Sequence, residues 1–198
     1  VGDVPLPLAI PFGFFPFNKT YSSGLIMPNF GDDYSRGFYL SGLGYYFAIN
    51  DYIDLQVTGD IYTRGTWAIR AQSKYIWRYH FSGNLSINYR NDVISEKGMP
   101  DYAVNKNFSL QWTHQQDSKA NPYCTFSASV NFATSGYSKY SATNLNDILA
   151  TQTNSSIAYS KNWAGTPFSL SANMSISQNS QNKTISVTLP TLVFNVSR

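Results

Sequence analysis

Apolar and polar residues alternate one by one along most of this chain. The stretch 53–58 reads Ile-Asp-Leu-Gln-Val-Thr, and the stretch 168–177 reads Phe-Ser-Leu-Ser-Ala-Asn-Met-Ser-Ile-Ser. The stretches 84–90, 107–113, 125–132 and 184–189 repeat the pattern, whereas helical periodicity is nearly absent. Successive side chains of a β-strand point to opposite faces of its sheet. The pattern therefore predicts strands with one apolar face and one polar face.

The alternating runs and the breaks between them predict about nine strands. Their expected ranges are 36–49, 52–63, 66–80, 84–92, 105–115, 123–134, 153–162, 167–178 and 183–197. Several of these runs reach about ten residues, which is the length that a tilted strand needs to cross the hydrocarbon layer of a membrane. No run of about 18 apolar residues occurs, so no transmembrane helix is encoded.

The expected connections fall into two length classes. Short turns are predicted at Asn50-Asp51, Arg64-Gly65, Ser82-Gly83 and Ala164-Gly165-Thr166-Pro167, and longer polar connections near 91–106, 115–122 and 135–152. Short turns on one side of a sheet and long loops on the other are typical of outer-membrane barrels. Trp and Tyr also gather near strand ends, as they do in interfacial girdles.

Composition favours a membrane barrel over a soluble β-sandwich. Charged residues make up 13% of the chain and aromatic residues 16%, whereas about 25% of the residues of a soluble domain are charged. A sandwich alternates as well, but its outward faces are normally charged and its strands shorter. Here the polar faces carry Ser, Asn, Thr and Gln. The expected fold is all-β, a partial antiparallel transmembrane β-barrel, with about nine strands of a larger barrel.

Charge and chemistry exclude several classes of function. The net charge of +3 is scattered along the chain, so the basic footprint of a nucleic-acid-binding protein is missing. Cys124 is the only cysteine, and neither His80 nor His114 stands in a catalytic motif. No residue is assigned a catalytic role, no metal site or cofactor is expected, and Asp32-Asp33 is interpreted as a loop signal. The chain is not expected to be an enzyme.

Amide side chains on the polar strand faces are the candidate ligand contacts. If these faces line a hydrated lumen, their amides offer donors and acceptors to a sugar. Simple solvation of a lumen is the alternative for each of them. The candidates are Asn84, Asn88, Gln111, Asn131 and Asn173.

The first thirty residues differ from the rest because prolines interrupt the alternation. Proline cannot donate to a sheet ladder, so it is confined to edges, first positions and bulges. Residues 1–30 are expected to form a junction segment, and residues 31–198 the sheet. This segment is either a linker or an edge whose pairing is kept weak. Its prolines are Pro5, Pro7, Pro11, Pro16 and Pro28.

The spacing within this junction resembles the LptD family of LPS-assembly proteins. In that family two prolines five residues apart precede a Ser-Gly pair, three variable residues and a Pro-Asn pair. The stretches 45–49 and 62–65 also resemble the first barrel hairpin of the family. Two features differ, since consecutive basic residues before Ser-Gly and the cysteines that tie the two domains together in some members are missing. The matching residues are Pro11, Pro16, Ser23, Gly24, Pro28 and Asn29.

The resemblance implies a role in lipopolysaccharide export at the cell outer membrane of a Gram-negative bacterium. Family members join a periplasmic β-jellyroll to a barrel and insert lipopolysaccharide into the outer leaflet, through a lumen and a lateral seam between the first and last strands. The implied partners are lipopolysaccharide, outer-membrane lipids, a plug lipoprotein of the LptE type and a periplasmic bridge protein of the LptA type. Pro11, Pro16 and Pro28 would then weaken the seam, and Gly24 would let the backbone bend.

Two other functions remain open on the sequence alone. One is a different outer-membrane barrel, such as a passive porin or transporter, in which the proline segment is a plug or a linker. The other is a soluble carbohydrate-binding β-domain that uses its surface aromatic residues.

Overall fold

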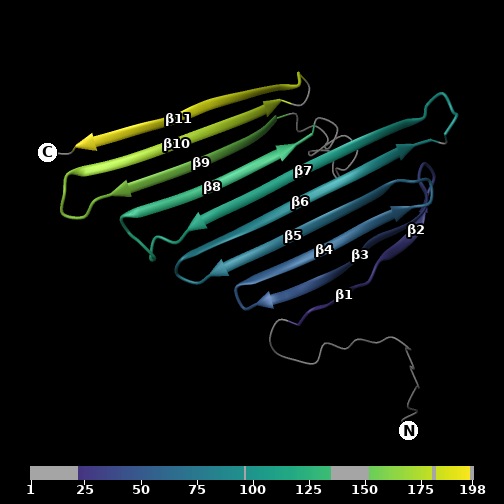
Figure 1. Cartoon of the computed structure of the whole chain (residues 1–198), viewed down its shortest axis with the longest axis horizontal. Helices are drawn as coiled ribbons and strands as arrows, with labels where there is room; N and C mark the ends of the chain where they lie inside the picture. Colours follow the sequence, from purple (N-terminus) through teal and green to yellow (C-terminus); the bar gives the residue numbers. More distant parts are fainter. Residues whose placement is uncertain (1–21, 96, 135–151, 180–181, 197–198) are drawn as a thin grey trace, which may run out of the picture.

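The structure is a computed structural model that describes residues 22–95, 97–134, 152–179 and 182–196. These residues form a single antiparallel sheet of eleven strands (Figure 1). The strands are β1 (Gly24–Ile26), β2 (Asn29–Asp33), β3 (Gly37–Asn50), β4 (Ile53–Tyr62), β5 (Trp67–Trp77), β6 (Phe81–Ile94), β7 (Ala103–Gln116), β8 (Cys124–Ala133), β9 (Gln152–Asn162), β10 (Phe168–Asn179) and β11 (Thr184–Val196).

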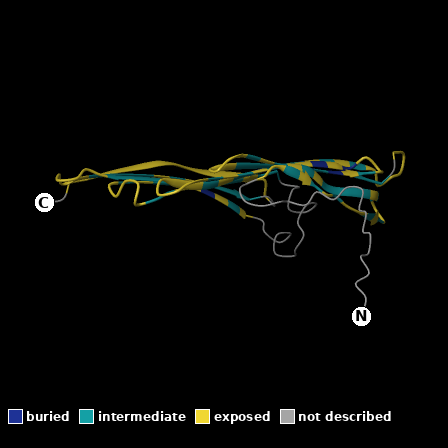
Figure 2. Cartoon of the chain, turned by 90° about the horizontal axis from the view of Figure 1, so that it is seen from below, coloured by how far each residue is buried: buried dark blue, intermediate teal, exposed yellow. Residues whose placement is uncertain are grey.

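Each strand from β3 to β11 pairs with its neighbours in chain order. At one edge, both β1 and β2 pair with β3, and at the other edge lies β11. The sheet is therefore an open meander and is not closed on itself. Figure 2 shows it nearly edge-on as a single, gently curved layer.

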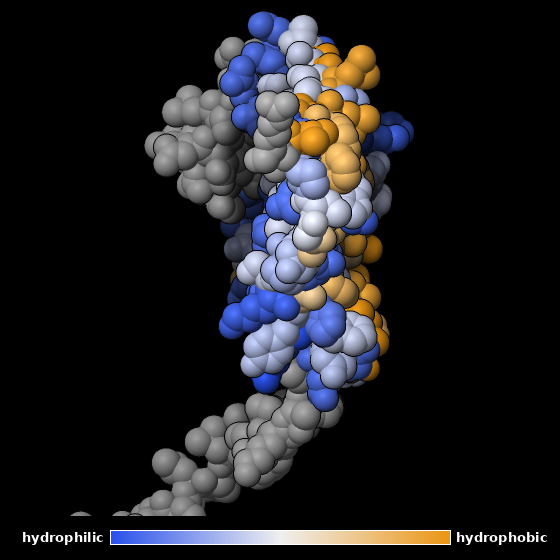
Figure 3. Space-filling view, turned by 90° about the vertical axis from the view of Figure 1, so that its left-hand side faces the viewer, coloured by the Kyte–Doolittle hydropathy of each residue, from blue (hydrophilic) through white to orange (hydrophobic). Residues whose placement is uncertain are grey.

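The register places polar residues on one face and apolar residues on the other. Paired residues share a face of a sheet, and Gln72 pairs with Ser86, which in turn pairs with Gln111. On the opposite face, Ala71 pairs with Ile87 and Ile87 with Leu110. We call these the polar face and the apolar face. Seen from the side, the two faces separate into hydrophilic and hydrophobic halves (Figure 3).

The sheet has no conventional hydrophobic core. Among the described residues, the buried apolar side chains are two alanines, Ala68 and Ala128, whereas the buried polar side chains include Asp60, Asp92 and Asn107. The large apolar side chains, such as Ile69 and Phe132, are instead exposed. A layer of this kind inverts the pattern of a soluble domain, in which apolar residues are buried and charges are exposed.

Nine of the eleven strands agree with the sequence prediction to within about three residues, which is the usual uncertainty of strand boundaries. The prediction of about nine strands is nevertheless too low, because β1 and β2 form where the prolines interrupt the alternation. The expected boundary between residues 30 and 31 falls within β2. The division into a junction and a barrel portion stays a prediction.

The turn expected at Ser82-Gly83 is misplaced. Both residues lie within β6, and the chain turns at residues 78–80, where Tyr79 has a φ of 65°. Non-glycine residues rarely adopt a positive φ, so no glycine or proline announces this turn. Gly83 has a packing role instead, since a Cβ atom there would collide with the ring of Tyr75 on the neighbouring strand.

The expected separation of short and long connections is also wrong. The links 95–102 and 117–123 follow consecutive strands, β6 and β7. Consecutive links of a meander lie at opposite ends of the sheet, so these two cannot share a side (Figure 1). The short turn 63–66 lies at the same end as 95–102, while the turns 51–52, 78–80 and 163–167 lie at the end of 117–123.

Candidate lateral edge and polar sheet face

The first strand of the sheet is divided into two short pieces. Three residues of β1 pair with β3, from Gly24 opposite Tyr46 to Ile26 opposite Gly44. Five residues of β2 pair with the same strand, beginning with Asn29 opposite Ser41. Met27 and Pro28 belong to neither piece.

The register of β1 and β2 against β3 is nevertheless continuous. Asn29 follows Ile26 by three positions, and their partners Ser41 and Gly44 are also three positions apart. Pro28 therefore lies level with Gly42. The interruption is a local loss of pairing at this level and not a shift of the strand.

Gly42 is the extra residue of a β-bulge between β3 and β4. Ser41 pairs with Asp60 and Leu43 with Gly59, so Gly42 has no partner residue on β4. Its φ of 78° lies in the left-handed region, which glycine adopts without a steric penalty.

A single carboxylate oxygen accepts the hydrogen bonds of the polar groups at the bulge. Asp60 Oδ1 accepts hydrogen bonds from the Gly42 backbone N–H at 2.8 Å and from the Ser41 hydroxyl at 2.9 Å. Arg70 Nη2 donates to the same oxygen at 2.6 Å. Asp60 is 2% exposed. Its charge is paired with that of Arg70, and its hydrogen bonds to Ser41 and Gly42 hold the bulge of β3.

The predicted junction residues are partly described. Ser23 precedes β1, and its hydroxyl accepts a hydrogen bond from the Ala48 backbone N–H at 2.9 Å. Gly24 begins β1 and Asn29 begins β2. The φ of Gly24 lies outside the left-handed region, whereas Gly37 and Gly42 of β3 both have a φ of 78°. Pro11 and Pro16 lie outside the described residues. Their proposed effect on a seam stays a prediction.

All five predicted amide residues lie on the polar face, although they are not gathered into one site. Asn88 donates to the Ser109 hydroxyl at 3.0 Å, and Asn131 donates to the Asn154 backbone carbonyl at 3.0 Å. The cross-strand partners of the five include Thr113 for Asn84, Ser109 for Asn88, Ser86 and Asn131 for Gln111, and Ala158 for Asn173.

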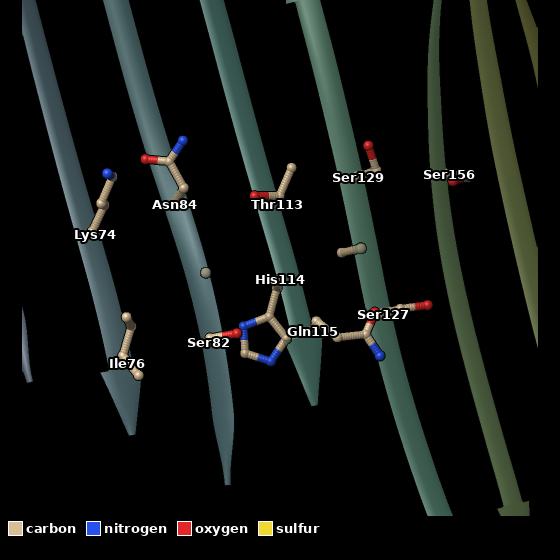
Figure 4. Close-up of a pocket in the computed structure, with 12 residues that line it drawn as sticks. Lys74, Ile76, Ser82, Asn84, Thr113, His114, Gln115, Ser127, Ser129 and Ser156 are labelled. Atoms are coloured by element: carbon tan, nitrogen blue, oxygen red, sulfur yellow. The ribbon is translucent and has the colours of Figure 1, made fainter. Parts of the chain in front are cut away.

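A shallow hollow of about 590 Å³ lies on the polar face. Five neighbouring strands each contribute one side chain to a row across it, shown in Figure 4. Apart from Lys74, this row offers uncharged hydroxyl and amide groups, which suit water or sugar hydroxyls. The row consists of Lys74, Asn84, Thr113, Ser129 and Ser156.

A second charged cluster lies on the polar face of β6 and its neighbours. Arg90 Nε donates to Asp92 Oδ1 at 2.7 Å, and Arg36 approaches the same oxygen at 3.9 Å. Asn107 donates to Asp92 Oδ2 at 3.3 Å, and the guanidinium groups of both arginines lie within 6 Å of the Tyr62 ring. Asp92 is 1% exposed. The cluster concentrates charge on the sheet end opposite the turns 51–52 and 78–80.

A polar contact among aromatic residues lies on the apolar face. The Tyr75 ring crosses Gly83, and its hydroxyl lies 2.8 Å from His114 Nδ1. The Trp112 indole N–H donates to the same hydroxyl at 2.9 Å. These aromatic residues join β5 to β7 across β6, near one end of the sheet, where rings with a polar tip would meet a membrane interface.

Sequence reasoning missed the function of Gly42 and Asp60. A glycine inside a strand pattern is a known signal of a bulge, and Gly42 stands within the predicted strand 36–49. The contact with Asp60 depends on cross-strand register, which alternation alone does not supply. The register of β4 places Asp54 and Asp60 on the same face of the sheet.

The described residues contain no helix that is both long and apolar enough to cross a membrane. Within the same residues, no group of three or more His, Cys, Asp or Glu side chains is placed to hold a metal ion.

The fold and the site define an all-β protein built on one two-faced antiparallel sheet with an interrupted first strand. Comparison with known proteins places it more narrowly. The family model described as "LptD protein" matches residues 1–198, and the chain belongs to this family.

Relatives from Burkholderia agree with this assignment. The LPS-assembly protein LptD of Burkholderia cenocepacia (strain HI2424) is 34% identical over 115 residues, and so is that of Burkholderia orbicola (strain AU 1054). The protein of the same name from Burkholderia ambifaria is 33% identical over 115 residues. Each match covers 58% of this chain and 13% of the relative. The chain thus matches a small part of the length of these relatives.

Proposed function

We propose that this chain forms part of an outer-membrane β-barrel that inserts lipopolysaccharide into the outer leaflet through a lumen and a lateral seam. The observation that carries the proposal is the divided first strand at the edge of a two-faced sheet, in a chain of the LptD family. Relatives that carry the name LPS-assembly protein support the assignment of the substrate.

The apolar face supports a membrane setting. From β3 to β11 the strands contain between 10 and 14 residues, enough for tilted strands to cross a bilayer. Exposed apolar side chains are spread across the face and include Ile69, Phe132 and Leu192. Contiguous apolar surface of this extent requires a covering phase, and the hydrocarbon of the outer membrane would provide it.

The polar face supports a hydrated lumen. Its uncharged hydroxyl and amide side chains can exchange hydrogen bonds with the sugars of a passing lipopolysaccharide. The hollow bounded by Asn84 and Thr113 lies on this face. Asn84, Asn88, Gln111, Asn131 and Asn173 are therefore proposed as lumen residues.

The first strand supports a lateral seam. Proline removes a possible ladder hydrogen bond, and a hydrogen bond contributes about 0.5–1.5 kcal/mol net. Pro28 stands at the interruption between β1 and β2. A barrel whose first strand is weakly paired can open beside the last strand and release a lipid sideways.

The remaining parts of the proposal follow from the family. Residues 1–30 would join the barrel to a periplasmic jellyroll, with residues 31–198 in the barrel. An LptA-type bridge would deliver the lipid, and an LptE-type lipoprotein would occupy the lumen. The proposed location is the outer membrane of a Gram-negative cell.

The role of Pro28 can be tested in cells that depend on the full-length protein. We expect Pro28→Ala, alone and with Pro16→Ala, to strengthen pairing at the edge and to slow the arrival of new lipopolysaccharide at the cell surface. Pro122→Ala is the matched control, because Pro122 lies in the link between β7 and β8. Undiminished delivery in the Pro28 and Pro16 variant would contradict the proposal.

Photocrosslinking separates this function from a passive porin. A photoreactive residue at Leu25 should capture lipopolysaccharide in transit, and one at Val57 should capture much less. Both positions lie at the same level of the sheet, since Leu25 pairs with Tyr45 and Tyr45 with Val57. Equal capture would favour a porin-like wall.

A full-length protein that stays monomeric and soluble without detergent would instead indicate a carbohydrate-binding domain.

A further inference from the structure

The interruption of the first strand has two causes that meet at one level of the sheet. Pro28 has no backbone N–H to donate. Gly42, which lies level with it on β3, donates its N–H to Asp60 Oδ1 on the far side, at 2.8 Å. Neither residue therefore donates a hydrogen bond to the other strand, and this level separates β1 from β2.

We propose that Asp60 is a positioning residue that holds the Gly42 amide away from the first strand and so keeps that strand divided into β1 and β2. The inference rests on the proposed function and adds a second component to the seam. The prolines weaken the first strand itself, whereas Asp60 acts from β4, across β3.

The surroundings of Asp60 suit this task. One carboxylate oxygen accepts hydrogen bonds from the Gly42 N–H, the Ser41 hydroxyl and Arg70 Nη2. The residue is almost fully buried, and a buried carboxylate is costly unless it is paired and hydrogen-bonded. Arg70 supplies the pairing charge and Gly42 supplies the hydrogen bond. The bulge and the ion pair therefore stabilise each other.

The division makes β1 the piece that can move. A turn of residues 34–36 ties β2 to β3, and in it the Asp33 carboxylate accepts hydrogen bonds from the backbone N–H groups of Ser35 and Arg36. β1 is attached to β3 over only three residue pairs, with the Ser23 hydroxyl as a further tie. β1 can separate from β3 with Met27 and Pro28 as the hinge, while β2 remains in place.

The test uses the full-length protein with its native partners in lipid nanodiscs. A nitroxide spin label is attached through Met27→Cys in a Cys124→Ser background, and its mobility is compared among variants of Asp60. In Asp60→Ala the Gly42 amide is free to bond to the Pro28 carbonyl. We expect a loss of the mobile spectral component at Met27 and slower delivery of lipopolysaccharide in cells that carry the substitution.

Two matched variants show whether the change in label mobility results from loss of the hydrogen bond between Asp60 and Gly42. In Asp60→Asn the side-chain oxygen still accepts the Gly42 N–H, so the spectrum should remain that of the wild type. Asp92→Ala also removes a buried carboxylate paired with an arginine. Within the described part of the chain, however, Asp92 makes its hydrogen bonds to Arg90 and Asn107 and none to β3. It should leave the label unchanged.

The outcomes separate this inference from the proposed function. An unchanged spectrum in Asp60→Ala, or the same change in Asp92→Ala, overturns the role of Asp60. Immobilisation at Met27 with normal lipopolysaccharide delivery overturns the lateral seam and leaves the effect of Asp60 on pairing intact. If Asp60→Ala fails to insert, the double variant Asp60→Ala, Arg70→Met removes the orphaned cation and answers the same question.

Discussion

At the scale of single residues, the hydroxyl of Ser155 takes the place of backbone hydrogen bonds between β8 and β9. The ladder between β8 and β9 ends at Ser129 opposite Ser156. Beyond it, the Asn131 backbone N–H donates to Ser155 Oγ, and the Ser155 hydroxyl donates to the Asn131 carbonyl, both at 2.8 Å. One side chain thus satisfies both backbone groups of a residue where two strands diverge.

Replacement of this hydroxyl should destabilise the sheet. Ser155 is 7% exposed and Asn131 is half-buried, so Ser155→Ala leaves the partly buried N–H and carbonyl groups of Asn131 without this partner, at a cost of about 1 kcal/mol. The measurement is the urea midpoint of the full-length protein in lipid vesicles. The control Ser156→Ala alters an exposed neighbour on the polar face and should change stability by less than about 0.5 kcal/mol. Equal midpoints for the two variants would refute this role.

At the scale of elements, the bulge in β3 depends on the backbone freedom of Gly42. A Cβ atom at this position would meet no atom within 4 Å, so the φ of 78° is the only obstacle to a side chain. We expect Gly42→Ala to cost about 1–2 kcal/mol, the penalty for an L-residue in the left-handed region. Gly42→Asn should cost less, since Asn tolerates this conformation best among the non-glycine residues.

Gly59 provides the comparison for the Gly42 variants. It lies on β4 opposite Leu43, its φ is outside the left-handed region, and an added Cβ would make an ordinary contact of 3.5 Å with the Ala68 carbonyl. Gly59→Ala should therefore be tolerated. Thermal unfolding of both variants in the same lipid distinguishes the two sites. A larger loss for Gly59→Ala would mean that backbone strain does not set the cost at the bulge.

The strands were predictable because a sheet with two unlike faces imprints a period of two on the sequence. One face here is apolar and the other polar, so the alternation is uninterrupted over most of β4, β7 and β10. It fails at β1 and β2, where Pro28 and the local loss of pairing with β3 interrupt the period. It also fails at Tyr79, a turn residue whose type does not favour its backbone conformation.

The candidate site was predictable in part. Alternation alone places Asn84, Asn88 and Gln111 on one face, and the register confirms that placement. The link between Gly42 and Asp60 was not predictable, because it depends on which residues of β3 and β4 lie opposite each other. A single extra residue in one strand decides that register, and the sequence does not state where the extra residue falls.

At the scale of the whole molecule, the sheet requires something to cover its apolar face. Among the described residues most of the buried side chains are polar, including Asp60 and Asp92, whereas many Ile, Phe and Val side chains are exposed. The described strands provide no second layer (Figure 2). The open edges at β1 and β11 also leave backbone groups to be paired, and in lipid such groups must be satisfied within the protein. Closure into a larger barrel would meet both needs.

A charge placed on either face tests this arrangement directly. Ile87 lies near the middle of β6 on the apolar face, between Ala71 and Leu110, and is 36% exposed. Asn84 lies on the polar face of the same strand. In a bilayer Ile87→Lys should cost about 2–4 kcal/mol, as a cation at the midplane does, and lower the fraction of full-length protein that folds into lipid vesicles. Asn84→Lys should fold like the wild type, because its ammonium group would lie in the proposed hydrated lumen. Equal folding of the two variants would show that the apolar face does not face hydrocarbon.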